Sequence, residues 1–128
     1  MIELDERIEK LKETGAISED TARQVDELRR LFLREFGIQL TEENASACVT
    51  HICFALERIA RGEGITPVDE AVRDEILCDP KYDGACFITE RIFRNITALT
   101  EEERDYLIIH VIVLLYKICE DYDKQVLS

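Results

Sequence analysis

The chain of 128 residues has few of the residues that interrupt helices: two prolines and five glycines, and it has no tryptophan. It shows no alternation of apolar and polar residues between hairpin turns, so a sandwich or barrel of strands is not expected. Its five cysteines are an odd number and form no C-x-x-C pair. This pattern favours a reducing compartment over a disulfide framework.

Long apolar runs are also missing. The N-terminus, MIELDERIEK, is charged from its third residue and does not resemble a secretory signal. The longest charge-free apolar stretch near the C-terminus covers 106–116, which is too short to span a bilayer. We therefore expect a cytoplasmic protein without a membrane span.

Positive charge is scarce, because 28 acidic residues face 16 basic ones and the net charge is −12. Binding nucleic acid requires clustered Lys and Arg, so no direct nucleic-acid contact is expected. An anionic membrane surface is disfavoured for the same reason. A partner protein with a basic face fits this charge better.

The apolar residues that are present, 46% of the chain, recur with helical spacing in a chain long enough for one domain. Start signals precede the expected helices: the N-caps Ser18 and Thr41, and two residues followed by proline, Thr66 and Asp79. The sequence therefore predicts an all-α fold, a compact bundle of five to six helices. The expected helices cover 4–14, 18–37, 41–62, 68–77, 79–96 and a last one that begins at residue 100.

The last helix has two distinctive features. Thr100 and Glu103 form the S/T-x-x-E pattern of a capping box, in which the glutamate bonds the first backbone amide of the helix. The sequence YLIIHVIVLLY that follows is apolar on all sides. Such a helix is either central in a bundle or covered by a second subunit.

The chain contains two histidines, His51 and His110, each within an apolar helix. Each is compatible with a structural role, in which neighbours satisfy the ring nitrogens of a core imidazole. A metal site is not indicated, because neither histidine has a ligand residue four positions away on its helix. A hydrolytic triad is not indicated either, because no carboxylate lies beside either histidine in the sequence. We expect no metal, no cofactor and no catalytic activity.

A phosphoryl acceptor needs less machinery than an active site. The nucleophile is the neutral imidazole, which an apolar environment favours. Arg58 lies seven residues after His51, two turns along the same helix face, and its side chain leans back toward the histidine. Arg58 is therefore either a contact for a phosphoryl group or a solvated arginine at a helix end.

Two stretches carry a resemblance to a known family. THICFALERI (50–59) resembles the first histidine motif of PTS regulation domains, in which an arginine follows the histidine by seven residues. EERDYLIIHVIVLL (102–115) resembles the second motif, in which a glutamate precedes the histidine by seven. The D-P-x-Y stretch (79–82), the T-x-x-E start of the last helix and the separation of the histidines also match, and the similarity covers residues 18–122.

The resemblance implies a PRD-like bundle that pairs as a homodimer. It implies that His51 and His110 accept phosphoryl groups from the histidine-containing phosphocarrier protein or a sugar permease's B component. It also implies that Arg58 contacts the phosphate or the dimer interface. Phosphorylation would then control transcription or a partner through dimer packing.

The chain departs from the family pattern at two points. Thr50 stands where the family often has Asp before the first histidine. The family's regulators carry an RNA- or DNA-binding module, whereas residues 1–17 here are expected to form only a helical extension before a regulatory domain at 18–128. A stand-alone domain that acts on a partner is therefore expected. The alternative is a constitutive helical adaptor or dimerisation protein with structural histidines.

Overall fold

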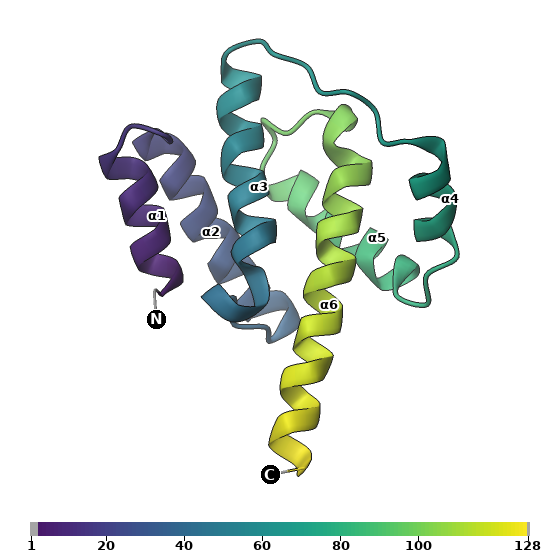
Figure 1. Ribbon diagram of the computed structural model, residues 1–128. Helices are drawn as coiled ribbons and strands as arrows, with labels where there is room; N and C mark the ends of the chain where they lie inside the picture. Colours follow the sequence, from purple (N-terminus) through teal and green to yellow (C-terminus); the bar gives the residue numbers. More distant parts are fainter. Residues whose placement is uncertain (1–2, 128) are drawn as a thin grey trace.

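The computed structural model describes the backbone of residues 3–127 and the side chains of residues 3–120, and every regular element in this part is helical. The all-α fold of five to six helices is thereby confirmed. Figure 1 shows the arrangement. The elements are α1 (Leu4–Glu13), α2 (Glu19–Phe36), α3 (Glu42–Ala60), α4 (Glu70–Leu77), α5 (Tyr82–Asn95), a short 3-10 turn η1 (Glu101–Glu103) and α6 (Arg104–Leu127).

Three of the expected boundaries are confirmed. The Ser18 hydroxyl accepts a hydrogen bond from the Thr21 amide and caps α2, which ends at Gly37 in the left-handed conformation with φ 65°. Thr41 caps α3 by accepting from the Asn44 amide, while the Asn44 side chain accepts from the Thr41 amide. Each of these residues relieves backbone groups that a helix end leaves unpaired.

The two proline signals are wrong by two or three residues. The cap of α4 is Asp69 and not Thr66, whose carbonyl oxygen instead accepts a hydrogen bond from the Tyr106 hydroxyl. The segment after α3 is thereby held against α6 before α4 begins. The helix α5 begins at Tyr82, because Asp79 forms a turn in which its carboxylate accepts from the Lys81 amide at 2.8 Å.

The helices α3 and α6 lie side by side in the bundle (Figure 1). On its other sides α6 packs most extensively against α5 and also contacts α4, while α2 packs against α3 and α1 against α2. Leu4 and Ile8 of α1 are buried in the same core as the other helices, so the segment expected as an extension packs into the bundle. By contrast, α4 contributes no buried residue.

The apolar helix α6 is covered on part of its circumference. Leu107, Val111 and Leu114 are buried in the core. Val113 remains 41% exposed, as does Tyr116. A central position that buries every face is therefore wrong, and α6 leaves an apolar face open. Within the described residues, no helix is long and apolar enough to cross a membrane.

Candidate functional site

The two histidines, 59 positions apart in the chain, meet between α3 and α6. The ring centroids of His51 and His110 lie 4.6 Å apart and the ring planes differ by 29°, which is a stacked arrangement. Tyr106, one turn before His110, lies with its ring centroid 5.9 Å from that of His51. The packing of α3 on α6 thus gathers three rings in one place.

A buried carboxylate just before the start of α6 lies against this cluster. Glu103 is 1% exposed, and its Oε1 lies 3.2 Å from Nε2 of His51. Its other oxygen, Oε2, accepts a hydrogen bond from Nη1 of Arg58 at 2.8 Å. Buried carboxylates persist in proteins when they are paired and hydrogen-bonded. Both oxygens of Glu103 meet this condition.

The capping box expected at Thr100 and Glu103 is wrong. The Thr100 side chain makes no capping hydrogen bond, and η1 precedes α6 in place of a regular first turn. The Glu103 side chain turns inward because Arg58 offers it a charge-assisted hydrogen bond and His51 a ring hydrogen bond. The spacing of seven residues between Glu103 and His110 does not predict this role, because the partners of Glu103 are on α3.

Arg58 reaches the cluster through this carboxylate. It lies two turns after His51 on α3, as its spacing indicates, and its side chain is 20% exposed. The hydrogen bond to Glu103 raises the pKa of Arg58 above its ordinary value, so the guanidinium stays charged. The structure therefore brings all three predicted site residues together and adds Glu103.

Burial favours the neutral form of both imidazoles. Desolvation lowers the pKa of His51, with a smaller opposing contribution from Glu103 and a further lowering by Arg58. Desolvation and the neighbouring His51 lower the pKa of His110 to about 4. Both rings therefore hold a nucleophilic lone pair at neutral pH.

The rings are also reachable from solvent. Among the described residues, the buried side-chain polar atoms without a hydrogen-bond partner are Thr89 Oγ1 and Arg91 Nε. Nδ1 of His51 and the two ring nitrogens of His110 also have no protein partner in this part of the chain, but they are not among these buried atoms. These three nitrogens are therefore accessible to solvent. Both histidines are accordingly half-buried and not enclosed in the core.

The tip of α3 provides a second polar cluster that includes no histidine. Glu57 accepts hydrogen bonds from the Thr21 hydroxyl and from the Ser18 hydroxyl, the latter at 3.3 Å. These hydrogen bonds join the start of α2 to α3, so their role is structural. Within residues 3–120, the structure assembles no group of three or more His, Cys, Asp and Glu that would hold a metal ion.

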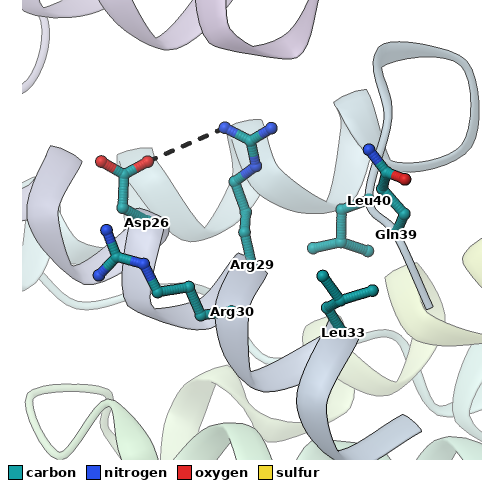
Figure 2. A pocket seen from close by; sticks show the side chains of 6 residues that line it. All are labelled: Asp26, Arg29, Arg30, Leu33, Gln39 and Leu40. Atoms are coloured by element: carbon teal, nitrogen blue, oxygen red, sulfur yellow. Dashed lines mark ion pairs between the residues drawn. The ribbon is translucent and has the colours of Figure 1, made fainter. Parts of the chain in front are cut away.

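A separate groove of about 300 Å³ lies along α2 and the segment after it. Figure 2 shows Asp26 paired with Arg29 on one side and Leu33 beside Leu40 on the other. Arg29 also pairs with Asp5 of α1, so its charge is already balanced. None of the residues that line the groove belongs to the histidine cluster.

Neither a protein-family model, nor a curated protein, nor a solved structure matches this chain.

Proposed function

We propose that this chain is a regulatory domain that is phosphorylated on His51 and His110 by the sugar phosphotransferase system. In this proposal it controls transcription or a partner protein through the packing of a homodimer. The observation that carries the proposal is the stacked, solvent-reachable pair of neutral imidazoles, one of which contacts the Glu103–Arg58 ion pair. The donor is the phosphocarrier protein or the B component of a sugar permease.

The chemistry of the cluster supports an acceptor more than a hydrolase. A phosphoryl acceptor requires a neutral imidazole that a donor protein can reach and a cation for the incoming charge. A nucleophilic enzyme requires in addition a hydroxyl or thiol held by the imidazole. Among the described residues, neither ring makes a hydrogen bond to a hydroxyl or thiol.

Phosphorylation would change the charge balance of the cluster. At neutral pH, Glu103 and Arg58 carry opposite charges and both rings are neutral. A phosphohistidine adds close to two negative charges to the cluster. The guanidinium of Arg58 has five N–H donors, of which one binds Glu103, so further donors can bind the phosphate. Competition between carboxylate and phosphate for Arg58 then supplies two alternative arrangements.

The open apolar surface beside the histidines supports the dimer. Phe54 and Val113 lie one turn after His51 and His110 on their helices, and they are 44% and 41% exposed. Since the two rings stack on each other, these apolar side chains flank the histidine pair. A second subunit that covers this surface would sense the added charge, and a coupling of about 1–3 kcal/mol is typical of such linkage.

The test is phosphoryl transfer from a reconstituted relay of phosphoenolpyruvate, enzyme I and the phosphocarrier protein. We expect acid-labile labelled phosphate on the wild-type chain, less on His51→Ala and on His110→Ala, and none on the double variant. A phosphoacceptor domain known to work with the same relay serves as the positive control.

The same relay separates the proposal from the constitutive adaptor with structural histidines. The adaptor predicts no label on the wild-type chain, and loss of stability alone in the two alanine variants. Sedimentation of the chain before and after the relay then reports whether phosphorylation changes self-association. Absence of label in the presence of a working positive control would refute the proposed function.

A further inference from the structure

Both oxygens of Glu103 have hydrogen-bond partners, and the chemistry of these partners determines which atom carries the hydrogen in the contact with His51. Arg58 is permanently charged and forms an ion pair with Oε2 at 2.8 Å, in which Glu103 is the carboxylate partner. An ionised carboxylate can only accept. The 3.2 Å contact between Oε1 and Nε2 of His51 therefore requires a hydrogen on Nε2.

This requirement determines which nitrogen of His51 is free to react. A neutral imidazole carries one N–H, and desolvation keeps His51 neutral at physiological pH. With the hydrogen on Nε2, the lone pair lies on Nδ1. Nδ1 has no partner among the described residues and is not one of the sealed polar atoms.

We infer that Glu103 is a positioning residue that holds His51 in the Nε2–H tautomer and thereby directs the phosphoryl group to Nδ1. This inference rests on the proposed function, because it concerns the position of the phosphate within the same site. It assigns no such restriction to His110, whose ring stacks on that of His51 without a carboxylate partner in the described part of the chain.

The transfer step balances with the residues present and a protein phosphohistidine as donor. The Nδ1 lone pair of His51 forms the new N–P bond, and the electron pair of the breaking N–P bond returns to the donor's ring nitrogen. The Nε2 hydrogen stays in its hydrogen bond to Glu103. The positive charge that develops on the phosphorylated ring is stabilised by the carboxylate, as in other carboxylate–histidine pairs.

Glu103→Gln provides a nearly isosteric test, because it should reverse the tautomer. Arg58 can only donate, so it would take the amide oxygen of the glutamine and leave the NH₂ group facing His51. A donor at that position requires a lone pair on Nε2 and moves the hydrogen to Nδ1. Glu103→Asp keeps a carboxylate and should keep the original tautomer.

The experiment uses the full chain and two readouts. Nitrogen NMR at neutral pH reports the tautomer of the resting His51, and phosphorus–nitrogen NMR after the relay reports the phosphorylated nitrogen. We expect Nε2–H and Nδ1-phosphate in the wild type and in Glu103→Asp. In Glu103→Gln we expect Nδ1–H, and a loss of phosphate on Nδ1 of His51 by about tenfold or more, with phosphate on His110 changed less than about twofold.

Glu102→Gln is the matched control, because it removes the same charge from the preceding, exposed residue of η1. It should retain the wild-type tautomer and the wild-type phosphate position. An Nδ1–H tautomer in the resting wild-type chain, or phosphate on its His51 Nε2, would overturn this inference alone. A chain that takes no phosphate on either histidine would overturn the proposed function and this inference with it. The wild-type tautomer can be measured even if Glu103→Gln does not fold.

Discussion

His51 and His110 lie ring against ring, but their surroundings differ in charge. The ring of His51 contacts the buried carboxylate of Glu103, which is itself held by Arg58. His110 contacts the ring of His51 and has no carboxylate partner within the residues that the structure describes. The pair therefore combines one imidazole tied to an ion pair with one that depends on packing alone.

The difference shows how one bundle gives two similar residues different properties. Desolvation lowers the pKa of both rings, but at His51 the carboxylate opposes it, whereas at His110 the neighbouring ring adds to it. A phosphate on His51 would compete with Glu103 for Arg58. A phosphate on His110 would alter the pair mainly through its own charge.

The largest expected effect comes from removing the cation on the His51 side. Arg58→Ala leaves the nearly inaccessible Glu103 carboxylate without its counter-ion, which should lower the free energy of unfolding by about 3 kcal/mol. Urea unfolding at neutral pH measures this. Arg61→Ala, which removes an exposed arginine paired with Glu63, should change it by less than about 0.5 kcal/mol. Equal effects of the two variants would show that the Arg58–Glu103 ion pair does not stabilise the His51 side of the cluster.

The second prediction concerns pH. The folded-state pKa values of both histidines lie below the unfolded value of 6.5, so below that pH the unfolded chain binds more protons than the folded chain. The contribution of the two neutral histidines to stability is therefore fully present above pH 6.5, and it is lost as the pH falls toward about 4. We expect a loss of about 1–2 kcal/mol between pH 7 and pH 5, after allowance for solvent screening of the partly exposed rings.

The His110→Gln variant sharpens this prediction, because it should remove more of the pH dependence than His51→Gln does. Thermal unfolding at a series of pH values measures both. A wild-type stability that stays constant from pH 7 to pH 5, or an equal effect of the two variants, would show that the two rings do not differ as described.

A third prediction compares alanine variants at neutral pH. His51→Ala removes the ring and also leaves Oε1 of Glu103 without its donor, so it should destabilise the chain by about 1 kcal/mol more than His110→Ala. Denaturant midpoints of the two variants, measured side by side, give the difference. His110→Ala as the more damaging change would contradict the account.

The smallest effect on the isolated chain is expected from the apolar surface. Val113→Ser should change the free energy of unfolding by less than about 0.5 kcal/mol, because the side chain is 41% exposed. It should nevertheless weaken self-association in sedimentation experiments, if the surface beside His110 forms the dimer. Val72→Ser, on α4 and 38% exposed, is the matched control and should leave association unchanged. Equal association of the two variants would place the interface elsewhere.

The sequence predicts the helices well because their caps are local. Ser18, Thr41 and Gly37 act on backbone groups within a few residues, so their effect can be read from neighbouring positions. The proline signal at Asp79 fails because its carboxylate forms a turn with the Lys81 amide, and the signal at Thr66 fails because a distant group intervenes. The hydroxyl of Tyr106 in α6 takes the Thr66 carbonyl, and no local pattern contains that contact.

The same distinction explains what the sequence predicts of the site. The spacing of His51 and Arg58 on one helix face is local and is reproduced. The role of Glu103 depends on how α3 packs against η1 and α6, so the capping box gave a plausible local assignment for a side chain that points elsewhere. A buried glutamate facing an arginine from another helix becomes recognisable only with the tertiary fold.

The most direct test of the central claim is to locate the phosphate. The wild-type chain is treated with the complete relay, digested at neutral pH to preserve acid-labile phosphate, and its peptides are fragmented in a mass spectrometer. The account predicts phosphate on the peptides that contain His51 and His110, at those two residues. A chain that leaves both peptides unmodified, while a known acceptor in the same tube is phosphorylated, would contradict it.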